Sequence, residues 1–245
     1  MTSLSIIIPA YNEEMSINKT ILSTLALKLD FPKIDFDIIV IDDGSKDDTY
    51  NVVKKTIKSS EIRLYKNDFN QGLGNTIKKG IKLANGEKFI FIPGDNDIPE
   101  TLLKKLLKNI DSAEIVTSFF INDEIRGRFR NFISGIFLLI YSTTFGIFLK
   151  YINGPAIYPT AKLKELTLHS RKFSIIAEIN TKLLTQGLSF MEIPGYRQNN
   201  DEKSPAVSTG SLLETIITYI KLIYIVKIKH KELFNKVPKR IYFND

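Results

Sequence analysis

Residues 36–45 read FDIIVIDDGS, an apolar run that ends in two acids, a glycine and a serine. Apolar runs of the same kind occur at Leu4–Ile8, Ile62–Tyr65, Lys88–Ile92 and Glu114–Ser118. Amphipathic stretches with helical spacing separate them, near 14–29, 47–59, 72–84 and 100–110. Strands that alternate with long crossovers indicate right-handed βαβ units. The sequence therefore predicts an α/β fold with an open, mostly parallel sheet flanked by helices.

The composition indicates a folded protein that binds anions. Of its 245 residues, 43% are hydrophobic and 25% are charged, which is too apolar for a disordered chain. At about 150 residues per domain, the length fits one large domain with appendages. The absence of cysteine and the presence of two histidines exclude a disulfide scaffold, a thiolate metal site and a cysteine nucleophile, and leave oxygen atoms as metal ligands. The net charge of +7 favours anionic partners such as phosphorylated ligands, lipid headgroups or nucleic acid.

The loops that follow the predicted strands carry the candidate ligands. In an open parallel sheet, ligands bind outside the carboxyl ends of the strands. The segments at these ends are PAYNEE at 9–14, DDGS at 42–45, NDFNQG at 67–72 and GDND at 94–97.

Two acid pairs in these loops suggest a ligand site. Asp95 and Asp97 place two carboxylates on one loop, which suits Mg²⁺ or Mn²⁺ together with substrate phosphates; a solvated turn is the alternative. Asp42 and Asp43 end the second strand, and the alternative for this segment is a turn in which Ser45 or Asp47 caps the next helix.

Residues 70–75, NQGLGN, open a predicted helix with two glycines. The third glycine of a dinucleotide-binding fingerprint is absent, because Ile77 occupies its position. The backbone N–H groups of this turn can still approach a phosphate, and a plain helix start explains the pattern equally well.

In this order and spacing, four segments resemble the family-2 glycosyltransferases of GT-A fold: LSIIIPAYNE at 4–13, IVIDDGS at 39–45, NQGLG at 70–74 and the D-x-D at 95–97. Later segments resemble the dolichol-phosphate mannose synthase-like branch, which makes polyprenyl-phosphate sugars, at 126–134, 152–155, 177–179 and 192–194. The resemblance spans residues 4–205. It implies a nucleotide-sugar domain, a divalent cation, inversion at the anomeric carbon and a membrane-borne lipid phosphate acceptor.

The resemblance also assigns roles to residues. Asp42 and Asp43 would bind the base and ribose, and the rest of the nucleotide-sugar site would be Pro9, Tyr11, Glu13, Gln71, Asp95 and Asn96. Asp95 and Asp97 would hold Mg²⁺ or Mn²⁺, with Asp97 acting in catalysis. The acceptor phosphate would be bound by a set in which Arg130 is catalytic, namely Arg126, Arg128, Arg130, Ser134 and Arg197.

The chain departs from the family pattern in three places. Ile98-Pro99 follows the D-x-D where the family often has Leu-Gln, and Phe119 stands where an arginine is expected. Residues 197–204 lack the glycine of the acceptor loop. Arg126 or Arg128 is the expected substitute for the absent arginine.

Two apolar stretches predict contact with a membrane surface. Residues 132–149 carry no charge but barely reach the length needed to cross a bilayer. A crossing would separate Glu178 from Asp95, so we expect one or two interfacial helices, with a buried helical hairpin as the alternative. Residues 211–235 predict a basic amphipathic helix. No secretory signal precedes the first strand, so we expect a peripheral or monotopic protein on the cytoplasmic face of a membrane.

We therefore expect a nucleotide-sugar half at 1–125, an acceptor half at 126–210 and a basic C-terminal helix and tail at 211–245. The predicted activity is that of an inverting, metal-dependent glycosyltransferase that moves a sugar from a UDP- or GDP-sugar to dolichyl or undecaprenyl phosphate. Transfer to a sugar hydroxyl in polysaccharide or O-antigen assembly is the alternative. A second alternative is a non-catalytic nucleotide- or nucleic-acid-binding protein. We do not expect nucleic acid as a partner, because acid pairs repel a phosphate backbone unless a metal is bound.

Glu178 distinguishes the two transferase hypotheses. A phosphate monoester has a second pKa of about 6 and is already anionic at neutral pH. A sugar hydroxyl needs a general base. Glu178 lies in the helical run at 174–186, on the acceptor side according to the resemblance, and a structural role in that helix is the favoured alternative.

Overall fold

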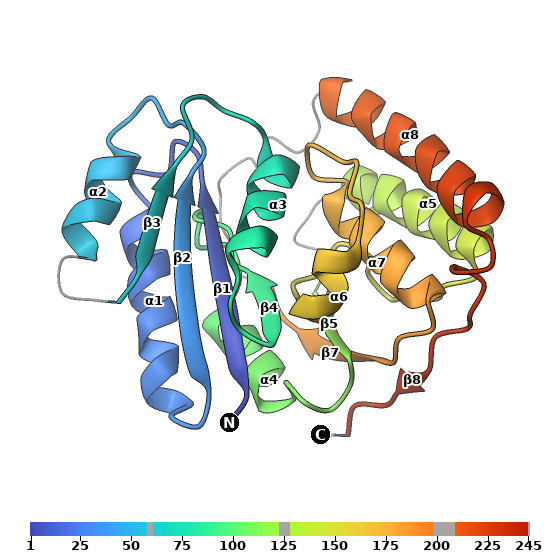
Figure 1. The fold of residues 1–245 in the computed structure, drawn as a ribbon, viewed down its shortest axis with the longest axis horizontal. Coiled ribbons are helices and arrows are strands. Elements are labelled where there is room, and N and C mark those ends of the chain that lie inside the picture. The colour runs from blue at the N-terminus through green and yellow to red at the C-terminus, as the bar shows by residue number, and fades with distance from the viewer. Residues whose placement is uncertain (58–60, 123–127, 198–208, 245) are drawn as a thin grey trace.

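The computed structural model describes residues 1–57, 61–122, 128–197 and 209–244. It contains one eight-stranded sheet with the strand order β3-β2-β1-β4-β6-β5-β7-β8 (Figure 1). The strands are β1 (Ser3–Ala10), β2 (Asp35–Asp42), β3 (Arg63–Lys66), β4 (Lys88–Phe91), β5 (Ile115–Phe120), β6 (Ala156–Pro159), β7 (Phe190–Gly195) and β8 (Arg240–Ile241). All pairings are parallel except those of β6 with β4 and β5. The mostly parallel α/β sheet is therefore confirmed.

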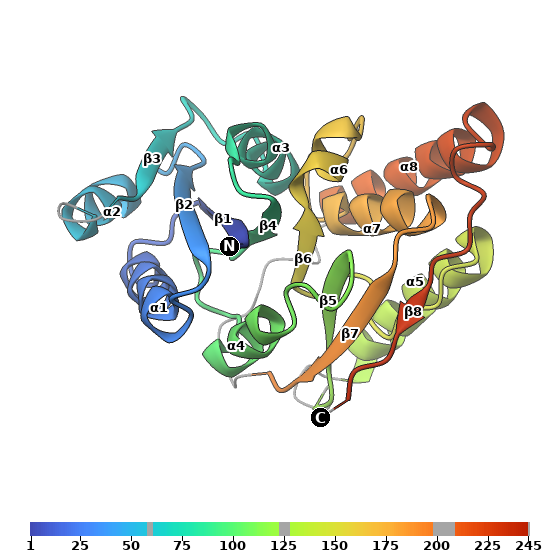
Figure 2. The same ribbon diagram turned by 60° about the horizontal axis from the view of Figure 1, so that its bottom comes forward.

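Helices pack on both faces of the sheet (Figure 2). One face is covered by α1 (Ile17–Asp30), α2 (Thr49–Thr56) and α4 (Glu100–Lys108). The other is covered by α3 (Leu73–Leu83), α5 (Arg128–Phe145), α6 (Thr160–Glu165), α7 (Ile175–Thr185) and α8 (Thr209–Ile223), which continues as a π-helical turn (Tyr224–Lys229). The four expected helices of the first 110 residues are all present.

The core is built by the two-residue period of the strands. In β1, Leu4, Ile6 and Ile8 join the apolar cluster under α1 and α4, while Ile7 joins the cluster on the opposite face. Successive strand residues point to opposite faces, so a strand buried on both sides reads as an unbroken apolar run. This is why the sequence pattern located β1, β2 and β4 correctly.

The far edge of the sheet lies outside the sequence predictions. β6 has four residues, and the outermost strand β8 has two, which pair with β7 at Phe190↔Arg240 and Met191↔Ile241. The Arg240 guanidinium bonds to the buried Glu192 carboxylate and to the Phe148 carbonyl, which fastens this last strand to the rest of the sheet.

Candidate active site

Three neighbouring strands end together at the carboxyl edge of the sheet. Ala10 is paired with Asp42, and Asp42 with Lys66, so the loops after β1, β2 and β3 leave the sheet side by side. β4 lies on the other side of β1, with Phe91 opposite Ile7. In Figure 1 these loops lie at the upper edge. The structure thus brings the predicted nucleotide-sugar segments to one edge.

The loops after β1 and β2 are held together by reciprocal hydrogen bonds. The Asn12 N–H donates to Ser45 Oγ (3.0 Å), and the Lys46 N–H donates to Asn12 Oδ1 (2.9 Å). The Glu13 N–H donates to Thr49 Oγ1 (2.7 Å). Asn12 has a φ of 56°, a left-handed conformation that asparagine tolerates better than most residues. These bonds fix the segment in which Pro9, Tyr11 and Glu13 were predicted to line the donor pocket.

Asp42 ends β2 and is completely buried. Its Oδ1 accepts hydrogen bonds from the backbone N–H (3.1 Å) and the hydroxyl of Ser45. Its Oδ2 receives no hydrogen bond from the described residues, and the Lys66 ammonium lies 3.9 Å away. At the end of β2, one carboxylate oxygen is therefore buried with only a long ionic contact to the described residues.

Asp43 holds the turn that opens α3. Its Oδ1 accepts from Asn67 Nδ2 (2.7 Å) and the Gln71 N–H (3.0 Å), and its Oδ2 accepts from the Gly72 N–H (2.9 Å). Gly72 has a φ of 86°, a conformation that disfavours other residues. Asp43 therefore orders the loop after β3, a role the sequence analysis did not include.

Of the two residues expected to cap the next helix, Ser45 and Asp47, it is Asp47 that contacts the start of α2, while the Ser45 hydroxyl bonds to Asp42. Asp47 Oδ1 accepts hydrogen bonds from the Thr49 N–H (3.1 Å) and hydroxyl (2.5 Å) at the start of α2. Burial acts to raise the pKa of Asp47, but the hydrogen bonds from Thr49 and from the Glu14 N–H outweigh it and lower the pKa. Asp42 and Asp43 do not cap α2, which leaves them for the carboxyl edge.

Asp95 and Asp97 lie on the exposed turn after β4. The Asp97 N–H donates to Asp95 Oδ1 (3.1 Å), and Asn96 between them has a φ of 57°. The turn is anchored by Gly94, which donates to the Pro9 carbonyl (3.0 Å) and accepts from Thr20 Oγ1 (3.0 Å). Two carboxylates on a fixed turn fit a hard cation that takes its remaining ligands from phosphates. Within the described residues no cluster of three or more acids and histidines forms around a common point.

The predicted acceptor residues are only partly described. Arg126 lies outside the described residues, and the side chains of Arg128 and Arg130, on the first turn of α5, do as well. Ser134 is half-buried one turn further along α5. The guanidinium of Arg197 stacks 3.9 Å from the ring centre of Phe120, at the end of β5.

Glu178 is buried and structural. Its carboxylate accepts from the His169 N–H (3.0 Å) and the Ser170 N–H (2.7 Å), and it pairs with the Lys182 ammonium one turn along α7. The lysine belongs to the same helix, at the i,i+4 spacing. The structural alternative for Glu178 is confirmed.

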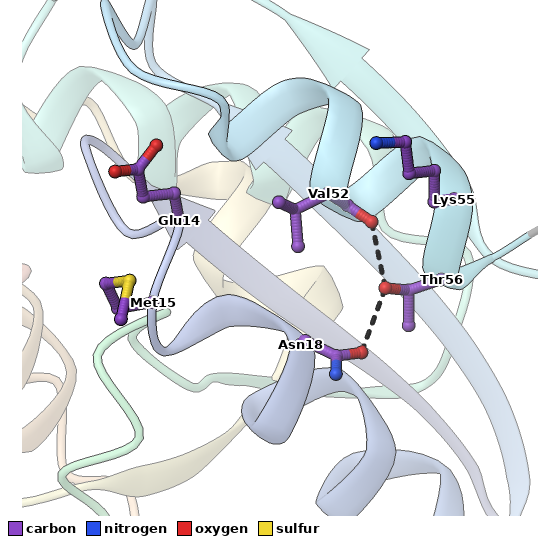
Figure 3. A pocket seen from close by; sticks show the side chains of 6 residues that line it. All are labelled: Glu14, Met15, Asn18, Val52, Lys55 and Thr56. Carbon is purple, nitrogen blue, oxygen red and sulfur yellow. Dashed lines mark hydrogen bonds between the residues drawn. The ribbon is translucent and has the colours of Figure 1, made fainter.

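A hollow of about 510 Å³ lies between α1 and α2 rather than at the acid pairs (Figure 3). It is lined by Glu14, Met15, Asn18, Val52, Lys55 and Thr56. Thr56 Oγ1 bridges the Val52 carbonyl and Asn18 Oδ1 across its floor. None of the predicted site residues lines this hollow.

Helices α5 and α8 lie side by side (Figures 1 and 2). Both expose apolar side chains. Tyr219 of α8 packs on the rings of Tyr141 and Phe145, and its hydroxyl bonds to Thr144. The other sides of these helices form what we call the apolar face: Phe132, Ile133, Ile136, Leu139, Ile140, Leu213, Ile216, Ile217 and Ile220, each more than two-fifths exposed. Among the described residues, no helix has the length and hydropathy required to span a bilayer.

Comparisons with known proteins give the family context. The family model "Glycosyl transferase family 2" matches residues 5–167. An uncharacterized protein of Methanocaldococcus jannaschii is 29% identical over 89% of this chain and 98% of its own length. A dolichyl-phosphate beta-glucosyltransferase of Dictyostelium discoideum is 25% identical over 79% of this chain and 68% of its own length. Some curated relatives are longer, and the chain spans 19% of one and 36% of another.

A solved structure shares the fold. Glucosyl-3-phosphoglycerate synthase of Mycobacterium tuberculosis, in complex with Mn²⁺, UDP-glucose and phosphoglyceric acid, superposes with a TM-score of 0.70. The match covers 91% of this chain and 80% of the other, at 18% identity. At this identity the likeness shows the GT-A-type sheet and its helices.

Proposed function

The chain belongs to glycosyl transferase family 2, and from this premise we propose that it transfers a sugar from a nucleoside diphosphate sugar to a polyprenyl phosphate at a membrane surface. That it is a glycosyltransferase using a nucleotide sugar follows from its family and relatives. The observation that carries the finer proposal is the combination of two acid pairs on one sheet edge with the apolar face of α5 and α8. The acid pairs suit a nucleotide-sugar donor and a cation, and the apolar face suits contact with the lipid surface that carries the acceptor.

The donor would bind at Asp42 and the loops beside it. Asp42 Oδ2 is a buried acceptor without a hydrogen bond from the described residues, and the bases of nucleotides carry N–H donors. Pro9, Tyr11 and Glu13 lie on the adjoining loop after β1. The Asp43 carboxylate accepts three hydrogen bonds from Asn67, Gln71 and Gly72, in the loop before α3. We therefore propose that Asp43 positions Gln71 and the glycine turn for contact with the donor.

Asp95 and Asp97 would hold Mg²⁺ or Mn²⁺, and Asn96 would line the same turn. A divalent cation supplies Lewis-acid stabilisation of the negative charge that develops on the leaving nucleoside diphosphate. The chain's contribution is the fixed turn itself, because Gly94 is bonded to both β1 and α1. Preorganised carboxylates need little rearrangement when the donor binds.

The acceptor would be a phosphate rather than a sugar hydroxyl. Its anionic oxygen attacks the anomeric carbon as the bond to the diphosphate breaks, so no protein base has to remove a proton. Glu178, the candidate base, is instead buried in contacts with His169, Ser170 and Lys182. The acceptor phosphate would meet Arg126, Arg128, Arg130, Ser134 and Arg197. The relatives named as dolichyl-phosphate glucosyltransferases support this class of acceptor.

The apolar face would lie on the lipid surface. Exposed apolar patches of this extent mark interaction sites, and exposed Lys221, Lys227, Lys229 and Lys231 follow along the same segment. An apolar helix face flanked by lysines is the pattern of a helix that lies in the interface of an anionic membrane.

A donor and acceptor screen tests the proposal. The purified protein is incubated with radiolabelled UDP- or GDP-sugars, dolichyl or undecaprenyl phosphate and Mg²⁺ or Mn²⁺, and the lipid phase is counted. We expect label in the lipid phase with one donor base, and none after chelation of the cation. Label that enters only when a sugar acceptor with a free hydroxyl is supplied would contradict the proposed acceptor.

A further inference from the structure

Glu214 is the single acid in the apolar stretch 211–226, and it faces into the protein. Its Oε1 accepts from Ser170 Oγ (2.9 Å) and the Arg171 N–H (3.0 Å), with the Lys172 N–H at 3.4 Å. Its Oε2 accepts from Ser174 Oγ (2.6 Å). Burial acts to raise the pKa of Glu214, but these hydrogen bonds outweigh it and lower the pKa. One carboxylate of α8 therefore holds the whole segment before α7.

That segment packs against the glycine turn that opens α3. The Gly74 N–H donates to the Arg171 carbonyl (2.9 Å). A Cβ on Gly72 would lie 2.6 Å from the Arg171 carbonyl oxygen, and one on Gly74 would lie 2.7 Å from its carbonyl carbon. Real Cβ atoms do not approach backbone this closely, so the two backbones touch without an intervening side chain. Any displacement of Arg171 has to move the glycine turn.

The glycine turn lies at the carboxyl edge of the sheet, which we call the donor edge because the donor is proposed to bind there. Asp43 accepts from the N–H groups of Gln71 and Gly72, and Asp43 adjoins Asp42 at the end of β2. A continuous series of contacts therefore runs from α8 through Glu214, the Arg171 backbone and the glycine turn to the two acids that end β2. Each step is a hydrogen bond or a direct backbone contact.

We propose that Glu214 is a positioning residue for donor binding: through the segment 170–174 it ties α8 to the glycine turn and so fixes the donor edge. The inference rests on the proposed function and deepens it. Leu213, Ile216 and Ile217 surround Glu214 in sequence and belong to the apolar face. The same stretch of α8 therefore carries both the proposed membrane contact and the hydrogen bonds of Glu214 to the segment 170–174. The donor edge and the lipid surface are thereby held at a set separation, which is what an in-line transfer between them requires.

The test measures nucleotide binding by the full chain. Kd values for UDP and GDP are determined by calorimetry in the presence of Mg²⁺ for the unaltered protein, Glu214→Ala, Glu214→Gln and the control Glu232→Ala. Glu232 is an exposed acid just after the same helical segment. We expect Glu214→Ala to raise the Kd of the bound nucleotide about tenfold, equivalent to about 1.4 kcal/mol. Glutamine keeps one acceptor oxygen and should have a smaller effect, and Glu232→Ala should stay within about twofold.

The Kd separates positioning from general stability. A purely structural role would lower the melting temperature and the number of binding-competent molecules, while the Kd of the folded fraction stayed the same. That result, or unchanged Kd values at full stoichiometry in both Glu214 variants, would overturn the inference. Glu214→Gln preserves the shape of the side chain, so it tests the hydrogen bonds to the segment 170–174 even if the alanine variant folds poorly. If the unaltered protein bound neither UDP nor GDP, the proposed function would fall together with this inference.

Discussion

Replacing Asp43 by asparagine should destabilise the protein, although the two side chains have nearly the same shape. The amide oxygen can still accept from Asn67 and Gln71, but the new NH₂ group then faces the Gly72 N–H, which keeps Asn70 Oδ1 (2.9 Å) as its acceptor. The buried NH₂ group is therefore the donor left without an acceptor. Leaving a buried donor unsatisfied costs about 1–3 kcal/mol. Because the Gly72 N–H keeps its bond to Asn70 Oδ1 and water can reach part of this half-buried turn, we expect a loss of about 1–2 kcal/mol in the free energy of unfolding.

Urea unfolding followed by circular dichroism measures this loss, and Asp42→Asn is the matched control. Asp42 Oδ2 receives no hydrogen bond from the described residues, so the same chemical change one residue earlier removes none. We expect Asp42→Asn to cost less than about 1 kcal/mol of stability, while weakening nucleotide binding if Asp42 receives the base. Equal unfolding midpoints for Asp43→Asn and the unaltered protein would refute the role assigned to Asp43.

The remaining expected outcomes concern the cation site, the membrane, the acceptor side of the site and the pH dependence of stability. Asp97→Asn should abolish turnover while circular dichroism and the melting temperature stay normal; full activity in EDTA would contradict this. The protein should sediment with anionic liposomes through its apolar face and less so at high salt, because salt screens the lysines; indifference to liposomes would favour another partner for that face. Glu178→Gln should lower the melting temperature, since it leaves the buried Lys182 ammonium with the Thr167 carbonyl but without a counter-charge. It should retain activity per folded molecule within about tenfold, whereas Arg130→Ala should raise the acceptor KM. The lowered pKa of Glu214 means that its contribution to stability is present above the ordinary glutamate pKa and is lost as the pH falls through its folded value; urea midpoints of Glu214→Gln and the unaltered protein should therefore differ at pH 7 and converge in acid.

The strand–helix repeat that contains β1 to β5 could be predicted from the sequence. Each of β1 to β5 is an apolar run beside an amphipathic stretch, so local pattern and final structure agree. β6 and β8 are short, and their places depend on partners far away in sequence: Phe89 pairs with Tyr158, and Phe190 with Arg240. No local pattern records such pairings.

In the candidate site, too, features set by local sequence could be predicted, and features set by partners distant in sequence could not. Acids at strand ends predicted a ligand edge, and the strand register shows that β1, β2 and β4 lie side by side and run in the same direction, so that their carboxyl ends share that edge. The sequence did not show that Asp43 would hold the glycine turn, because its partners, the N–H groups of Gln71 and Gly72, are backbone atoms that every residue but proline carries. Glu214 had a visible signal, since an acid in an otherwise apolar helix requires a partner. Its partners, Ser170 and Arg171, lie more than forty residues earlier.

The two-residue strand β8 has a consequence for biogenesis. Until residue 240 has left the ribosome, the outer edge of β7 has no neighbour, and Glu192 lacks the guanidinium of Arg240. An unpaired strand edge invites pairing with other chains. The first four strands can meanwhile pair among themselves, because β1, β2, β3 and β4 are all made within the first 91 residues. We therefore expect nascent chains to pair their first four strands early, whereas the glycine turn gains its contact with Arg171, and Arg171 its bond to Glu214, only after those later residues are made. We also expect them to stay prone to aggregation until the strand at 240–241 pairs with β7.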